Sequence, residues 1–169
     1  MGQDGREGGY GDFAAARAGH LYRSACLLTA GDTHLAEDLV QETLGRVYVH
    51  WGRVSRVGNP AGYAQTMLTR AFLAHRRRRS STERSTAAFP DRPGTDEDPS
   101  LRLTLLDALA GLPAKDRAVI VLRYWEDRSV QETADAMNVS SAAVRTRSVR
   151  ALARLRELLG EDLGEYART

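Results

Sequence analysis

The chain of 169 residues is poor in cysteine, lysine and aromatic residues. Its single cysteine, Cys26, excludes an intramolecular disulfide and any zinc site built on paired cysteines. Because Cys26 stands between apolar neighbours, a small buried side chain is favoured over a reactive thiol. No segment approaches the roughly 20 apolar residues that a membrane span needs. The first residues are Gly-rich and polar, unlike a signal peptide, so we expect a soluble cytoplasmic protein without membrane insertion.

Charge is distributed unevenly, although the net charge is only +2. Residues 1–79 carry 11 Arg against 7 acidic residues, whereas residues 80–100 carry 2 against 5. Residues 101–169 are nearly balanced, with 11 basic against 10 acidic residues. The acidic middle segment lacks periodicity and is rich in Ser, Thr and Pro, which is typical of a flexible linker. The parts on either side are each long enough for one small domain.

Apolar and small residues recur at helical spacing on both sides of this linker, and no convincing pair of strands occurs. The sequence therefore predicts an all-α fold with two small helical domains joined by a flexible linker. The predicted domains are 12–79 and 101–160, the linker is 80–100, and the ends 1–11 and 161–169 are expected to be tails, the first of them disordered. The expected helices are 12–29, 36–51, 60–79, 101–110, 115–127, 130–137 and 141–159.

The tetrapeptide VQET occurs twice, at 40–43 and 130–133, but the flanking residues differ and give no internal repeat. The second copy follows Ser129, and Ser129 with Glu132 matches a capping box that starts a helix. Asn138 tolerates the left-handed conformation that ends one. Ser140 or Ser141 then caps the next helix. A short helix, a tight turn and a longer helix predict a helix-turn-helix, whose second helix enters the major groove of DNA.

The expected helix 141–159 places an apolar stripe inward and five arginines, with no acid among them, between positions 145 and 156. A merely solvated helix face, the alternative, usually mixes both signs. Arginine binds guanine edges or phosphates, and the sequence alone does not distinguish the two roles. The candidate DNA-binding residues of this helix are Ser141, Ala142, Arg145, Thr146, Arg147, Val149 and Arg150.

Four polar residues on the helix that carries the first VQET lie opposite its apolar stripe: Glu37, Asp38, Gln41 and Glu42. The acids lie near the helix N-terminus, where the helix dipole favours negative charge. They could instead bind an Arg-rich partner, or a metal ion together with His34. All three explanations stay open at this point.

Several segments together resemble one known family. These are AEDLVQE at 36–42, the helix start at Asn59-Pro60, the segment LPAKDRAVIVLRYWEDRSVQETADAMNVS from Leu112 and the basic last helix. In this order they resemble the extracytoplasmic-function sigma factors, the small two-domain promoter-recognition subunits of bacterial RNA polymerase. The resemblance covers about residues 12–159.

This resemblance implies two macromolecular partners, core RNA polymerase through its beta-prime and beta subunits and promoter DNA. It also makes an anti-sigma factor an expected partner, and it implies no cofactor, no metal and no catalytic activity. The first domain would dock Glu37, Asp38, Gln41 and Glu42 on the beta-prime clamp and read the minus-ten promoter element. The second would place the residues from Ser141 to Arg156 in the major groove at minus thirty-five. The candidate minus-ten residues are Arg53, Arg56, Tyr63, Arg70, Arg76 and Arg77, which supply cations and a ring for an unstacked base.

The sequence departs from the family pattern in two places. Arg70 and Ala74 stand where related proteins often carry Asn and Asp, and Ala142-Ala143 stands where they often carry Gly-Thr. The promoter sequence therefore does not transfer by resemblance. Two other classes of function remain as hypotheses: a helix-turn-helix regulator that acts without polymerase, and a metal-dependent enzyme. No Gly-rich phosphate loop or nucleophile-base pair supports the enzyme.

Overall fold

The computed structural model describes residues 3–82 and 99–166, and no strand occurs among them. The all-α prediction is therefore confirmed. The first half contains α1 (Gln3–Leu28), α2 (Thr33–Val49), α3 (Trp51–Val54) and α4 (Pro60–Thr82). The second half contains α5 (Pro99–Ala110), α6 (Ala114–Ile120), the π-helical turn η1 (Val121–Trp125), α7 (Val130–Met137) and α8 (Ser141–Tyr166).

The first half is held by α1, α2 and α4, which pack around fully buried residues such as Leu21, Val47 and Phe72. The break between α1 and α2 uses Gly31, whose φ of 90° is a left-handed conformation that glycine adopts without steric cost. Asp32 then caps α2 by accepting a hydrogen bond from the Leu35 backbone N–H at 3.1 Å. Cys26 is buried, as its apolar neighbours indicated.

The prediction of a disordered tail over 1–11 was wrong for residues 3–11, which form the first turns of α1. Several glycines lower the helix propensity there, but tertiary contacts override it. The Tyr10 hydroxyl donates to the Leu44 carbonyl at 2.9 Å, and its ring meets Trp51 edge-on at 5.9 Å. Arg6 donates to the Val49 carbonyl at 3.3 Å. Gly9 also lies against the Trp51 indole, where a Cβ would be in ordinary van der Waals contact at 3.4 Å from the ring nitrogen.

The predicted limits of the linker and the C-terminal tail also require correction. Helix α4 continues to Thr82, α5 begins at Pro99 and α8 extends to Tyr166. The remainder of the expected linker, 83–98, and residues 167–169 lie outside the described residues.

In the second half, the predicted helix-turn-helix is confirmed as α7 and α8. Ser129 and Glu132 form both hydrogen bonds of the capping box. Asn138 ends α7 at φ 56° and ψ 47°, the left-handed conformation that its residue type allows. Of the two candidate caps for α8, Ser140 accepts the hydrogen bond, from the Ala143 N–H at 3.1 Å.

No sequence pattern predicted η1, where the Glu126 N–H donates to the Val121 carbonyl five residues back at 2.9 Å. The wider turn is followed by Asp127 at a positive φ of 53°. Together they redirect the chain between α6 and α7, and they set Trp125 and Glu126 against α1.

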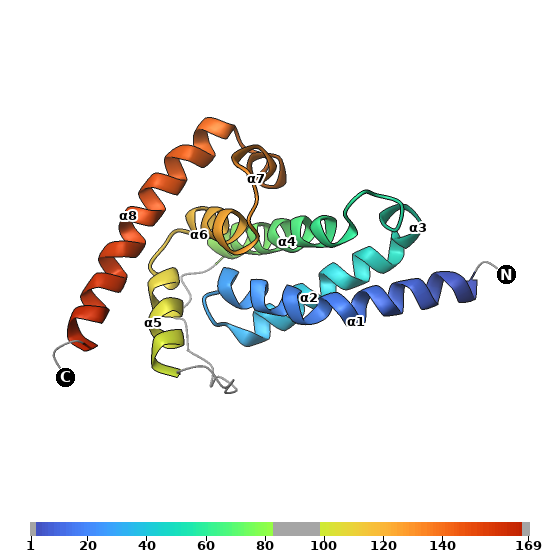
Figure 1. Ribbon diagram of the computed structural model, residues 1–169, viewed down its shortest axis with the longest axis horizontal. Coiled ribbons are helices and arrows are strands. Elements are labelled where there is room, and N and C mark those ends of the chain that lie inside the picture. The colour runs from blue at the N-terminus through green and yellow to red at the C-terminus, as the bar shows by residue number, and fades with distance from the viewer. Residues whose placement is uncertain (1–2, 83–98, 167–169) are drawn as a thin grey trace.

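The two halves pack directly against each other. Helices α6 and α7 contact α4, and η1 contacts α1 (Figure 1). One hydrophobic core runs through both halves, from Leu21 and Phe72 in the first to Val119 and Leu122 in the second. A second cluster joins α5, α6 and α8 around Leu109 and Ala151.

Candidate polymerase and DNA interfaces

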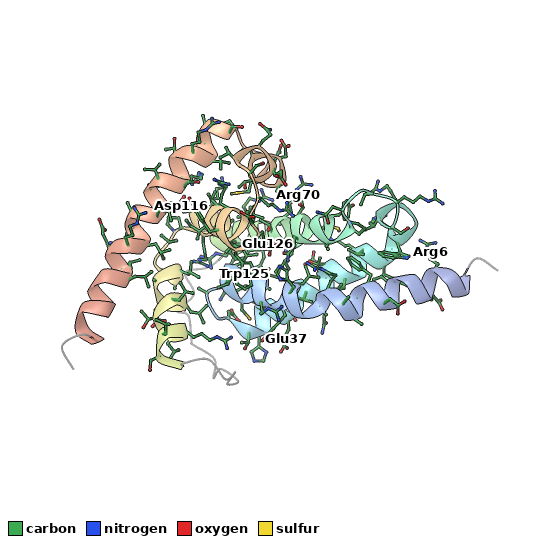
Figure 2. All side chains as sticks on the ribbon, viewed as in Figure 1. Arg6, Glu37, Arg70, Asp116, Trp125 and Glu126 are labelled. Carbon is green, nitrogen blue, oxygen red and sulfur yellow. The ribbon has the colours of Figure 1, made fainter. Side chains whose placement is uncertain are left out.

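The polar face of α2 projects away from the core. Its opposite side is fully used in packing, since Ala36, Leu39 and Val40 are buried. Figure 2 shows Glu37 at the outer edge of the molecule. Glu37, Asp38 and Gln41 are exposed. Glu42 is half-buried and accepts a hydrogen bond from Arg46, one turn on, at 2.8 Å.

The structure argues against two of the three explanations for the acidic face of α2, the helix dipole and the metal ion. The first turn of α2 contains no acid, because the cap is Asp32 and the helix begins at Thr33. The dipole acts mainly within the first turn, so it gives Glu37 and Asp38 little stabilisation. Among the described residues, no group of three or more His, Cys, Asp or Glu side chains is placed to hold a metal ion. Of the three explanations, binding of a positively charged partner is the one that the structure still supports.

At the junction of α3 and α4, two candidate minus-ten residues meet. Arg53 donates to the Tyr63 hydroxyl at 3.2 Å, and Arg56 lies exposed in the same corner. Asn59 caps α4 by accepting a hydrogen bond from the Gly62 N–H at 2.9 Å. A cation and a ring are thus held together at an exposed corner, as binding of an unstacked base requires.

Arg76 and Arg77 are exposed at the far end of α4, at about 20 Å from Tyr63 by helical rise. Arg70 lies between these two groups and has a different environment. Its guanidinium donates to the carbonyls of Ala136 at 2.9 Å and Asp135 at 3.0 Å, at the C-terminus of α7 (Figure 2). Both carbonyls belong to the last turn of α7 and carry its negative dipole end, which attracts a cation, and the Asp135 carbonyl also accepts from the Asn138 N–H at 3.3 Å. Arg70 is exposed, and in this arrangement its guanidinium is engaged by these two carbonyls.

On α8 the candidate residues divide into two groups. Ala142, Arg145, Thr146 and Val149 are exposed, and Val149 is 72% exposed despite its apolar side chain. Ser141 is half-buried and donates to the Gln131 side chain of α7 at 3.0 Å. The exposed group forms an open surface on the second helix of the motif.

Arg147 and Arg150 belong to the second group, because both bind Asp116 of α6. Arg147 donates to Asp116 Oδ1 at 2.8 Å, and Arg150 reaches Oδ1 at 2.8 Å and Oδ2 at 3.1 Å. Burial alone would raise the pKa of the Asp116 carboxyl, but the hydrogen bonds from Arg150 and Arg147 outweigh it and lower that pKa. The run without acids between Arg145 and Arg156 did not indicate these ion pairs, because the counter-charge comes from another helix.

Arg117 is a buried residue at the contact between the two halves that sequence reasoning missed. It is 5% exposed and donates to three carbonyls: Leu28 at 2.7 Å, Leu109 at 2.8 Å and Leu112 at 3.1 Å. Burial lowers its pKa to about 10, which leaves the guanidinium protonated at neutral pH. No local pattern could have indicated this role, because the acceptor at Leu28 is 89 residues away.

Comparison with known proteins agrees with this geometry. The family described as sigma-70 region 2 matches residues 14–82, and sigma-70 region 4 matches residues 108–157. The RNA polymerase sigma-E factor of Streptomyces coelicolor is 35% identical over 159 residues, which cover 92% of this chain and 89% of that protein. The ECF RNA polymerase sigma factor SigL of Mycobacterium tuberculosis is 34% identical over 149 residues, 83% of each.

Among solved structures, the sigma factor RpoE in complex with the anti-sigma factor NepR from Bartonella quintana has a similar fold. Its TM-score is 0.68 at 24% identity, and the match covers 89% of this chain and 96% of that one. The chain belongs to the extracytoplasmic-function sigma factors of the sigma-70 family.

As a sigma factor, the protein binds core RNA polymerase and directs promoter-specific transcription initiation, with region 2 reading the minus-ten element and the helix-turn-helix of region 4 the minus-thirty-five element. A regulator that acts without polymerase is not favoured. No helix within the described ranges combines the length and the apolar character of a membrane span.

Proposed function

We propose that the exposed face of α2 formed by Glu37, Asp38, Gln41 and Glu42 is the surface that binds the beta-prime subunit of core polymerase. The observation that carries the proposal is the division of α2 into a fully buried apolar side and an exposed acidic side. Exposed acids of this kind suit a partner that presents arginines or lysines, since complementary charge raises both association rate and specificity.

We further propose that the corner of Arg53, Arg56 and Tyr63 receives an unstacked base of the minus-ten element. Arg76 and Arg77 would then bind the phosphates of the same strand farther along α4. The support is the pairing of Arg53 with the Tyr63 hydroxyl, which fixes a ring beside a cation. Arg70 would join this surface only after its bonds to α7 are broken.

For the minus-thirty-five element, the exposed residues Ala142, Arg145, Thr146 and Val149 are the proposed base-reading group. An exposed valine side chain suits the methyl group of thymine, and Arg145 suits a guanine edge. We assign Arg147 and Arg150 chiefly to orienting α8 through Asp116, with Arg150, whose side chain is 58% exposed, also able to reach a phosphate.

We also propose where the protein acts and how it is regulated. The protein acts in the cytoplasm, where polymerase and DNA are, and it contributes no catalysis of its own. Because a protein of similar fold is bound by the anti-sigma factor NepR, we propose that an anti-sigma factor also restrains this one.

A charge-reversal experiment tests the polymerase surface. Glu37→Lys with Asp38→Lys should weaken binding to core polymerase at least about tenfold, since like charges would then face each other. The matched control is Glu7→Lys with Asp12→Lys, which makes the same change in net charge at exposed positions of α1. Affinity is measured by fluorescence anisotropy, and thermal unfolding checks that both variants fold. Equal affinities for the two double variants would contradict the assignment of the α2 face.

A further inference from the structure

A single buried acid of region 4 pairs with two arginines of the helix that reads DNA. Helix α8 carries five arginines between positions 145 and 156. Arg147 and Arg150 share the carboxylate of Asp116, which comes from α6 (Figure 2). The Asp116 side chain is only 2% exposed, whereas the side chain of Arg150 is 58% exposed. Asp116 therefore offsets one positive charge of α8 from a position that solvent hardly reaches.

The two paired arginines lie on the side of α8, away from the proposed base-reading group. At about 100° per residue, Arg150 lies about 90° and Arg147 about 150° round the helix from the centre of that group. The burial agrees with this placement, because Arg147 is half-buried and Arg150 is exposed. When the reading group is directed into the major groove, Arg150 is at the wall of the groove and Arg147 faces the protein.

Asp116 holds the guanidinium of Arg150 in one orientation. Arg150 Nε donates to Asp116 Oδ2 at 3.1 Å, and Nη2 donates to Oδ1 at 2.8 Å. This bidentate pair leaves Nη1 of Arg150 for one phosphate oxygen. Removing an arginine from the pair would leave a buried carboxylate short of a partner, which is costly. Phosphates of non-promoter DNA therefore compete poorly for Arg147 and Arg150.

The number of available cations on a DNA-binding helix affects its specificity. Lysine and arginine contacts to phosphates supply almost all of the non-specific affinity for DNA, and each contact makes that affinity more dependent on salt. Contacts to base edges supply the sequence preference. A freely moving arginine on the side of α8 would bind phosphates in many registers, including those in which the reading group misses its bases.

We propose that Asp116 is a positioning residue that determines specificity: by holding Arg147 and Arg150, it keeps them from binding the phosphates of non-promoter DNA, so that the base-reading group decides where α8 binds. This proposal rests on the proposed assignment of Ala142, Arg145, Thr146 and Val149 to base reading.

Asp116→Asn keeps the size of the side chain and removes its charge, so it makes both arginines available to phosphates. Binding of the full chain to a short fluorescent duplex of arbitrary sequence is measured by anisotropy over a range of salt concentrations. The slope of log affinity against log salt should steepen by about 0.9, the value of one phosphate contact, and the affinity at about 0.1 M salt should rise roughly fivefold to tenfold. An unchanged or shallower slope would overturn the proposal.

Glu157→Gln is the matched control, because it makes the same charge change beside another arginine of α8. Its partner Arg154 lies 3.2 Å away in an exposed pair, which water and salt already screen. The slope should therefore change by less than about 0.3. A change as large as that of Asp116→Asn would show that loss of any acid near α8 has this effect, and it would overturn the assignment to Asp116.

Circular dichroism shows whether Asp116→Asn stays folded, and two variants that retain Asp116 decide the question if it does not. Arg147→Gln leaves Arg150 on both carboxylate oxygens, so the salt slope should stay nearly unchanged. Arg145→Gln removes an exposed arginine of the reading group and should make the slope shallower by about 0.9. Equal changes in the two variants would overturn the proposal, because Arg147 would then bind phosphates itself.

Sequence preference is measured with the holoenzyme and a library of duplexes randomised in sequence. Sequencing of the bound fraction should show a flatter base preference for Asp116→Asn than for the wild-type chain and Glu157→Gln. If Arg145→Ala leaves the wild-type preference unchanged, the base-reading group is wrongly assigned and the proposal fails with it. If Arg145→Ala alters the preference but Asp116→Asn does not, the base-reading group stands and the role of Asp116 fails.

Discussion

The charged side chains of α2 in region 2 and of α8 in region 4 differ in whether other helices pair with them. Within the described part of the chain, Glu37 and Asp38 form no ion pair and face solvent. On α8, two of the arginines are held by a buried carboxylate from a different helix. A run of like charge on one helix therefore does not indicate which charges are available to a partner. Availability is decided by what the neighbouring helices contribute.

The largest effect is expected when the α8 partners of Asp116 are removed. Arg147→Ala with Arg150→Ala leaves a carboxylate that is 1% exposed without its two arginines. We expect a loss of about 3–5 kcal/mol in the free energy of unfolding, measured by urea denaturation. Adding Asp116→Asn to this variant should recover part of the loss, since no buried charge remains. Exposed Arg154→Ala, which removes only a surface pair with Glu157, should cost under about 1 kcal/mol.

The stability that Asp116 contributes should also depend on pH. Because the pKa of Asp116 is lowered in the folded state, its contribution is fully present above the unfolded value of about 3.9 and is lost as pH falls through the lower folded value. The stability difference between the wild-type chain and Asp116→Asn should therefore shrink as the pH is lowered below about 4. A difference that stays constant down to pH 2 would show that the ion pairs contribute nothing.

The exposed and paired arginines of α8 should differ in DNA binding. Arg145→Ala should cost about 1–3 kcal/mol in binding of the holoenzyme to minus-thirty-five DNA, and it should relax base preference at one position. Arg150→Ala should weaken binding more evenly across sequences and should also lower stability. Gel shifts with a set of single-base promoter variants at fixed salt separate the two patterns. Identical base profiles for both variants would contradict the division.

The smallest expected effect concerns the N-terminal turns of α1. Tyr10→Phe removes the hydrogen bond to the Leu44 carbonyl and should cost about 1 kcal/mol of stability. Hydrogen exchange should increase over residues 3–11 in particular. Tyr124→Phe, at a ring that is 53% exposed, is the control and should have little effect.

The sequence predicted those features that depend on local chemistry. The capping box at Ser129, the left-handed Asn138 and the helix start at Asn59 each follow from residue type and spacing over a few positions. They were enough to define the helices and the helix-turn-helix, and the quoted segments were enough to indicate the family.

The features that could not be predicted depend on contacts between distant residues. The pairing of Asp116 with Arg147 spans 31 residues, and that of Arg70 with Ala136 spans 66. The helical N-terminus is similar, because Gly-rich residues 3–11 become helical only against Tyr48 and Trp51. Hydrophobic periodicity and helix propensity depend on residues that are close in sequence, so they do not indicate partners that are brought together only by the fold.

The three hydrogen bonds of Arg117 are divided unequally between the two regions. Two of its three bonds, to Leu109 and Leu112, lie within region 4, and only the bond to Leu28 crosses to region 2. If the regions separated, the guanidinium nitrogen that binds the Leu28 carbonyl would meet water, while the bonds to Leu109 and Leu112 would remain. The hydration regained at that edge would offset part of the free energy lost with the bond to the Leu28 carbonyl.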